Sequence, residues 1–275
     1  MTREQERARA KRRYARRQAA AAAAAKETQR MRLVAIVVVV LLLVVGTFIV
    51  IAKKVGHSDS RAASPTGSTR SSASATLASG CTPPPVVPGT EGKLTKPSTA
   101  DVTAVTGRTV VATLSTNCGD IVIDLDGAKA PQAVASFVQL ARLGYWKDAP
   151  CPRLTAGAAS IAVLQCGDPT GTTQGSPGYG FAIENAPADD IYRRGVLAMA
   201  RPSANTEGNG GQFFIVYKDS TIPRDSAGGY TIFGRVRSGM DIVDRIAAGG
   251  VVGGGADGAP TFPISTLSVT TTTKD

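Results

Sequence analysis

The sequence predicts a mainly β fold, a closed β-barrel capped by two helices, preceded by one transmembrane helix and a disordered linker. Three observations lead to this prediction. Short β-rich runs separated by glycine turns fill the chain from about residue 109. Two amphipathic stretches with helical spacing lie among them. Near the N-terminus, one apolar run is long enough to cross a bilayer.

The first 32 residues are strongly basic. They hold 11 Lys and Arg against 3 Asp and Glu, so they carry most of the net charge of +10, and the remainder of the chain is close to neutral. A nearly neutral globular part argues against a nucleic-acid-binding domain. The run "EQERARAKRRYARRQAAAAAAAK" favours helix. We interpret residues 1–32 as a cytoplasmic topogenic segment near anionic lipid, with specific RNA binding as the alternative.

Residues 33–52 ("LVAIVVVVLLLVVGTFIVIA") contain no charge and predict a transmembrane helix, because about 20 helical residues span the hydrocarbon core. A cleavable signal peptide would be shorter and would end at small residues, whereas Lys53 and Lys54 follow here. The excess of basic residues before the span places the N-terminus in the cytoplasm and the C-terminal domain outside the cell membrane. We therefore expect an uncleaved, single-pass signal-anchor.

Residues 53–108 are rich in Ser, Thr, Ala and Pro and predict an extracytoplasmic linker. The globular domain is then expected over 109–275. It begins with "TVVATLSTNCGDIVIDLD", which reads as a β-hairpin that turns at residues 117–120. Residues 130–145 follow as a helix, since Pro131 suits the first turn and Gly144 can end it. Further strand-like runs occur at 161–166, 195–200, 212–217, 230–236 and 263–271, and a second amphipathic helix at 240–248.

Several catalytic chemistries are excluded by residue type. The only histidine is His57, in the predicted linker, so the domain has no Ser-His-Asp triad, no Cys-His pair and no His-ligated zinc. The glycine clusters "TEGNGGQFF" and "GGVVGGGADG" lack the context of a phosphate-binding loop. We predict no metal and no cofactor, and catalysis by shape, hydrogen bonding and electrostatics.

Several segments together resemble one family. "CPRLTAGAASIAVLQCGDPTGTTQGSPGYGF", "GVLAMARPSANTEGNGGQFFIVYKDS" and "GYTIFGRV" are similar, in this order, to the cyclophilins, which are peptidyl-prolyl cis-trans isomerases. The match covers residues 109–271 and is nearest to the membrane-anchored extracytoplasmic bacterial forms. The resemblance implies an antiparallel, eight-stranded barrel that binds and isomerises proline-containing segments.

The resemblance also assigns roles to residues. It implies that Arg153 is the catalytic arginine, with Gln165 and Gln212 beside it, and that Phe214 is the floor of the proline pocket. Phe213 would face the barrel interior, since neighbours on a strand point to opposite sides. Further substrate-binding residues are expected at Ala200, Arg201, Val163, Ile222 and Tyr230.

The sequence departs from the family pattern around this site. Cys151 and Pro152 replace a Phe-His pair, and Ala162 and Val163 thin the pocket wall. Arg201 stands in place of an asparagine and Tyr230 in place of a histidine, while a Trp-Leu pair becomes Ile222 and Pro223. We therefore expect activity with altered substrate preference and weak cyclosporin binding.

Four cysteines in an exported domain indicate disulfides. Of the three possible connectivities, one pairs Cys151 with Cys166, which flank the segment that carries Arg153, and Cys81 with Cys118, which would attach the linker to the first hairpin. Zinc binding and buried thiols remain alternatives.

Two functions follow. The first is an isomerase that assists folding of exported proteins at the outer face of the cytoplasmic membrane. The second is a cyclophilin-like module that binds proline segments, or scaffolds a complex, without useful turnover.

Overall fold

The computed structural model describes residues 77–85, 92–156 and 161–274. The basic segment, the predicted transmembrane helix at 33–52, His57 and much of the predicted linker lie outside the described residues. Within them, no helix combines the length and the apolar character that crossing a membrane requires.

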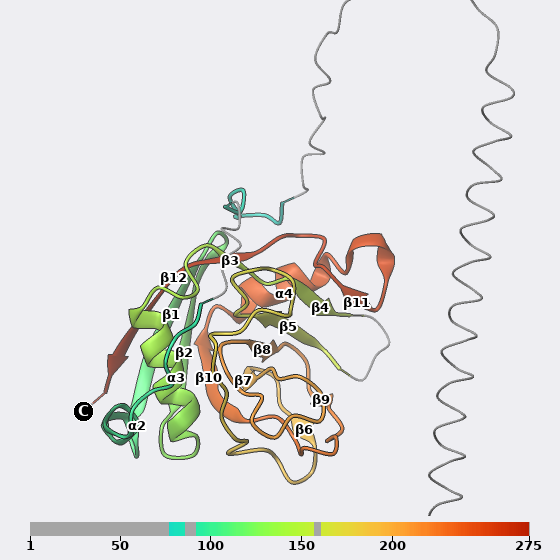
Figure 1. The fold of residues 1–275 in the computed structure, drawn as a ribbon. Coiled ribbons are helices and arrows are strands. Elements are labelled where there is room, and N and C mark those ends of the chain that lie inside the picture. The colour runs from blue at the N-terminus through green and yellow to red at the C-terminus, as the bar shows by residue number, and fades with distance from the viewer. Residues whose placement is uncertain (1–76, 86–91, 157–160, 275) are drawn as a thin grey trace, which may run out of the picture. The chain divides into compact units, whose positions relative to one another are not determined.

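The described part is built on one antiparallel sheet with the strand order β11-β4-β5-β8-β7-β10-β2-β1-β12-β3 (Figure 1). Its strands are β1 (Thr109–Thr116), β2 (Gly119–Asp126), β3 (Ala149–Pro150), β4 (Arg153–Thr155), β5 (Val163–Cys166), β7 (Val196–Met199), β8 (Phe213–Val216), β10 (Ile232–Ser238), β11 (Asp257–Gly258) and β12 (Ser265–Thr273). A separate pair joins β6 (Ile191–Tyr192) to β9 (Ser220–Thr221). The predicted hairpin and the five later strand runs are confirmed.

The prediction of a closed, eight-stranded barrel is wrong in two respects. Over the described residues the main sheet has ten strands, and its edge strands β11 and β3 do not pair with each other. Only Cys151 and Pro152 separate β3 from β4, so one extended segment changes partner from β12 to β5. Pro150 and Pro152 have no N–H to donate, which interrupts the ladder at this point. The two-residue strands β3 and β11 are too short to give a hydrophobic pattern in the sequence.

Both predicted helices are present, as α3 (Pro131–Arg142) and α4 (Met240–Ala248), and a 3₁₀ turn follows at Val252–Gly254. A third helix, α2 (Thr99–Val105), was not predicted from the sequence and packs against α3. Its N-terminus is capped by Ser98, whose hydroxyl accepts a hydrogen bond from the Asp101 N–H, while the Asp101 carboxylate accepts one from the Ser98 N–H. Such a capping box is a recognised start signal for a helix.

Part of the range assigned to the linker is ordered against the sheet. A disulfide joins Cys81 to the β1–β2 turn at Cys118, and the side-chain amide of Asn117 donates a hydrogen bond of 2.7 Å to the Thr82 carbonyl. Further along, the amide of Gln139 on α3 donates to the carbonyl of Thr95. The ordered structure therefore begins earlier than residue 109.

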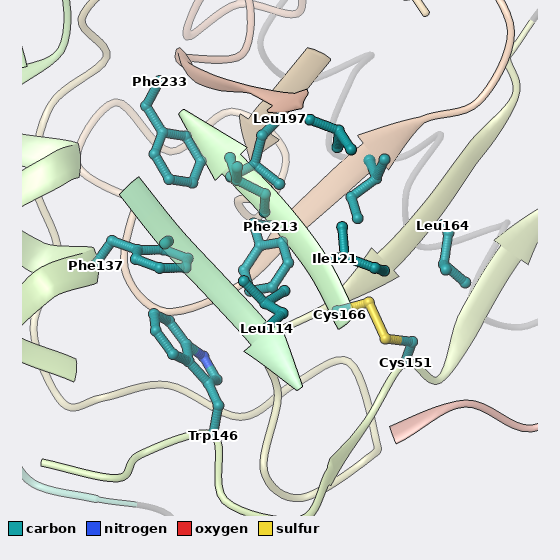
Figure 2. Close-up of a cluster of buried hydrophobic side chains, with 14 of the residues drawn as sticks. Leu114, Ile121, Phe137, Trp146, Cys151, Leu164, Cys166, Leu197, Phe213 and Phe233 are labelled. Atoms are coloured by element: carbon teal, nitrogen blue, oxygen red, sulfur yellow. A yellow bond between two sulfur atoms is a disulfide. The ribbon is translucent and has the colours of Figure 1, made fainter. Parts of the chain in front are cut away.

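The main core lies between α3 and the curved sheet. Phe137 of α3 packs within 6 Å, centroid to centroid, of the rings of Trp146, Phe213 and Phe233. Figure 2 shows these side chains together, with the Cys151–Cys166 disulfide beside them. Because Phe213 belongs to this core and the next residue on β8 does not, the strand separates the core from a second, smaller cluster.

Candidate active site

All nine residues predicted to act in catalysis or substrate binding line one cleft of about 770 Å³. They come from β4, β5, β7–β8 and the loops that follow, and the antiparallel pairing brings them together although they span residues 153–230 in the sequence. These residues are Arg153, Val163, Gln165, Ala200, Arg201, Gln212, Phe214, Ile222 and Tyr230. Their individual roles remain predictions.

The guanidinium of Arg153 is held from two sides. Its Nε donates to Oδ1 of Asp257 at 2.8 Å and its Nη2 to Oδ2 at 2.7 Å, so the ion pair is two-armed. From the other side, Nη1 donates to Oε1 of Gln165 at 3.0 Å. The Asp257 carboxylate raises the pKa of Arg153, and hydrogen bonds from Arg153 lower the pKa of Asp257. Arg153 therefore stays a cation at any physiological pH.

The two glutamines continue this contact as a hydrogen-bond chain. Gln165 donates from Nε2 to Oε1 of Gln212 at 2.9 Å, and Gln212 donates from Nε2 to the carbonyls of Thr173 and Gly175 at 3.1 and 2.8 Å. Both N–H groups of Gln212 are used in this way, which leaves its Oε1 as the atom with spare capacity, as an acceptor. The chain fixes the orientation of both side-chain amides.

A buried carboxylate shapes the loop that ends this chain. Asp168 is fully buried and accepts hydrogen bonds from the Thr170 N–H at 2.8 Å and from the Gly175 N–H at 3.1 Å. A side chain at position 175 would collide with this carboxylate, since a Cβ there would lie 2.0 Å from Oδ1. The segment "GDPTGTTQG" is thus folded by its own aspartate so that two carbonyls face Gln212.

Phe214 belongs to the apolar part of the cleft lining. It is 5% exposed and belongs to the second hydrophobic cluster, with Val163 and Ile222. The ring of Tyr230 meets it edge-on at 5.7 Å between centroids, and the ring of Tyr192 lies 6.2 Å away. The prediction that Phe213 enters the core while Phe214 faces the cleft is confirmed.

Arg201 lines the cleft, but internal partners hold its guanidinium. The side chain has no exposed surface and makes a two-armed ion pair with Asp225 at 2.9 and 3.0 Å. Its Nη2 also donates to the carbonyl of Gly228, and its Cζ lies 4.8 Å from the centre of the Tyr230 ring. Hydrogen bonds from Arg201 hold the pKa of Asp225 well below its usual range. In this structure Arg201 supports the wall that Tyr230 forms.

All four cysteines are paired, Cys81 with Cys118 and Cys151 with Cys166. This is one of the three connectivities that the sequence left open, and because every sulfur is bonded to another, the alternatives of zinc ligation and free thiols are wrong. The Cys151–Cys166 bridge lies at the β4–β5 pair on which Arg153 and Gln165 are direct partners. Within the described residues, no cluster of three or more His, Cys, Asp or Glu could hold a metal ion.

Sequence reasoning missed two residues that build the site. Asp257 lies in "GGVVGGGADG", a segment considered only as a phosphate loop, and no local pattern pairs it with an arginine 104 residues earlier. Tyr192 packs under Phe214 and accepts a hydrogen bond of 2.7 Å from the Tyr230 N–H. The two-residue strand β6 that carries Tyr192 has no periodicity to reveal it.

Comparisons with known proteins identify relatives of this chain. Residues 111–271 match the family model described as "Cyclophilin type peptidyl-prolyl cis-trans isomerase/CLD". "Probable peptidyl-prolyl cis-trans isomerase B" of Mycobacterium tuberculosis is 40% identical over 209 residues, which cover 71% of this chain and 65% of that protein. The protein of the same name from Mycobacterium leprae is 39% identical over 189 residues, which cover 64% and 62%.

A solved structure is also similar, the cyclophilin-type peptidyl-prolyl cis-trans isomerase of Cryptosporidium parvum. It aligns with a TM-score of 0.49 and 28% identity, covering 61% of this chain and 99% of that one. The chain spans a little under two thirds of the length of its mycobacterial relatives.

Proposed function

Because the chain belongs to the cyclophilin-type peptidyl-prolyl cis-trans isomerase family, we propose that it catalyses rotation about X–Pro peptide bonds in exported proteins. The uncatalysed rotation has a barrier of about 20 kcal/mol and takes tens of seconds or longer. A rate gain of about 10⁵-fold requires about 7 kcal/mol of differential stabilisation of the twisted amide. Three features of the cleft can supply this stabilisation: the unused donors of Arg153, the apolar pocket at Phe214, and the fixed side-chain amides of the two glutamines.

The observation that carries the proposal is the unused donor capacity of Arg153 beside an apolar pocket. A guanidinium has five N–H groups, and three of those of Arg153 are used by Asp257 and Gln165. Two remain for a substrate. When the prolyl ring lies on Phe214, these donors can bond the prolyl region and draw the nitrogen lone pair out of amide resonance.

The hydrogen bonds of the two glutamines limit what each side chain can offer to a substrate. Since both N–H groups of Gln212 are used by backbone carbonyls, Gln212 can offer substrate only its Oε1, which suits a backbone N–H next to the proline. Gln165 orients Arg153 through its own Oε1. The donors are preorganised before substrate arrives, which is the condition for electrostatic stabilisation of a transition state.

The test is acceleration of cis-trans exchange in a proline-containing peptide by the purified full chain, measured by exchange NMR. Arg153→Ala should remove most of the rate. Arg194→Ala is the matched control, because Arg194 has similar exposure, makes a two-armed pair with Asp244, and is absent from the cleft lining. Peptide binding without exchange would instead support the alternative of a proline-binding or scaffolding module.

We also propose that the domain works at the outer face of the cytoplasmic membrane, held by the segment 33–52. The apolar run and its flanking charges support this location. So do the two disulfides, because such bonds persist in oxidising compartments. Protease added to intact cells should remove the domain and leave residues 1–32 protected. Protection of the domain would contradict the proposed topology.

A further inference from the structure

Backbone pairing at the edge of the sheet brings Asp257 beside Arg153. In the ladder between β11 and β4, Asp257 is the partner of Thr155 and Gly258 the partner of Leu154. The Ala156 N–H also donates to the Ala256 carbonyl at 2.8 Å. The carboxylate therefore projects from a segment that is fixed to the same strand as Arg153.

Both oxygens of this carboxylate contact Arg153, and Asp257 itself does not line the cleft. The contact through which Asp257 reaches the cleft is its ion pair with Arg153. The two-armed contact fixes the plane of the guanidinium, and the hydrogen bond from Nη1 to Oε1 of Gln165 holds the side that does not face Asp257. The directions of the two unused N–H groups are then fixed. Without Asp257, the long arginine side chain would be held only by the single bond to Gln165.

A second ion pair in the described part of the chain has the same form and serves as a comparison. Arg194 and Asp244 also form a two-armed pair, and their side chains are 44% and 46% exposed, against 41% for Arg153 and 51% for Asp257. Two pairs with the same two-armed geometry and similar exposure should contribute similarly to stability. The difference lies in the location, since Arg153 lines the cleft and Arg194 does not.

We propose that Asp257 is a positioning residue, which holds the guanidinium of Arg153 so that its two unused N–H groups point at the prolyl bond. This proposal rests on the proposed isomerase function. It predicts that removal of the carboxylate lowers kcat and kcat/KM together, because the oriented donors act in the transition state. Asp257→Asn keeps one acceptor oxygen and should lie between the wild type and Asp257→Ala.

The experiment compares the full-length wild type with Asp257→Ala, Asp257→Asn and Asp244→Ala. For Asp257→Ala we expect a loss of about tenfold to a hundredfold in kcat, the size that a small misplacement of a catalytic group produces, with a melting temperature close to that of Asp244→Ala. Asp244→Ala should keep the wild-type kcat. Wild-type kcat in Asp257→Ala overturns the proposal, and so does an equal loss of kcat in Asp257→Ala and Asp244→Ala.

A second measurement does not depend on activity. The Nε–H resonance of Arg153, assigned by its absence in Arg153→Lys, should exchange slowly with water in the wild type and faster in Asp257→Ala. If the wild type shows no isomerase activity, the proposed function fails, whereas the exchange rate still reports whether Asp257 holds Arg153. An unchanged exchange rate in Asp257→Ala overturns the proposal in that case.

Discussion

Removal of the Cys151–Cys166 disulfide should lower both the stability and the isomerase rate. The bridge joins residues 15 apart in the sequence. In the chain-entropy treatment, closing a loop of that length stabilises the folded state by about 3 kcal/mol. For a domain of this size, the double variant Cys151→Ala/Cys166→Ala should then melt about 6 to 12 °C lower. The rate should fall because β4 is joined to β5 by only two residue pairs, one of which is Arg153 with Gln165.

The second disulfide provides the control. Cys81 and Cys118 are 37 residues apart and lie outside the cleft lining, so Cys81→Ala/Cys118→Ala should lose about 4 kcal/mol and keep the wild-type kcat. Calorimetry gives the melting temperatures, and exchange NMR of a proline peptide at a temperature well below both transitions gives the rates. If Cys151→Ala/Cys166→Ala keeps the wild-type kcat, or if both double variants lose kcat in proportion to stability, the bridge does not position β4.

Three further predictions concern the pocket and its surroundings. Phe213→Leu and Phe214→Leu should both lower the melting temperature, but only Phe214→Leu should lower kcat/KM, by about tenfold, because Phe213 packs in the core; equal losses of kcat/KM would contradict this assignment. Cyclosporin should inhibit weakly, since Ile222 lines the cleft where the resemblance implies a tryptophan in many members of the family, and potent inhibition would show that Ile222 was misassigned. Burial raises the pKa of Glu184, and this effect exceeds the lowering by the hydrogen bonds that its carboxylate accepts from backbone N–H groups at the start of α3. A raised carboxyl pKa favours the folded state below the unfolded pKa, and this stability is lost as the pH rises through the folded value. Between about pH 4 and 7, the melting temperature should therefore fall less in Glu184→Gln than in the wild type. Parallel curves of melting temperature against pH for the two proteins would show that titration of Glu184 does not contribute.

Local sequence patterns located most of the regular elements. Alternating β-branched residues marked the hairpin of β1 and β2, and apolar spacing of 3 and 4 residues marked α3 and α4. Shorter elements escaped, because strands of two residues such as β3 and β11 have no period to detect. The helix α2 was missed although Ser98 and Asp101 form its cap, since the surrounding prolines and threonines are typical of a linker.

The residues of the cleft were found by resemblance to a family, and the sequence could name them because family motifs are contiguous. "GNGGQFF" places Gln212 and Phe214 on one strand, and the period of two along that strand separates Phe213 from Phe214. The cysteine pairing was one of three possibilities in the sequence, and it was decided by which strands are neighbours.

Only the tertiary structure determined how the charged and amide groups of the cleft are partnered. The contact of Asp257 with Arg153 links residues 104 apart, and the ion pair of Arg201 with Asp225 holds the Arg201 guanidinium beside the ring of Tyr230. Hydrogen bonds and ion pairs depend on distances of about 3 Å and on direction. The sequence records which groups exist, whereas the pairing of strands and the folding of glycine-rich loops decide which of them come within that distance.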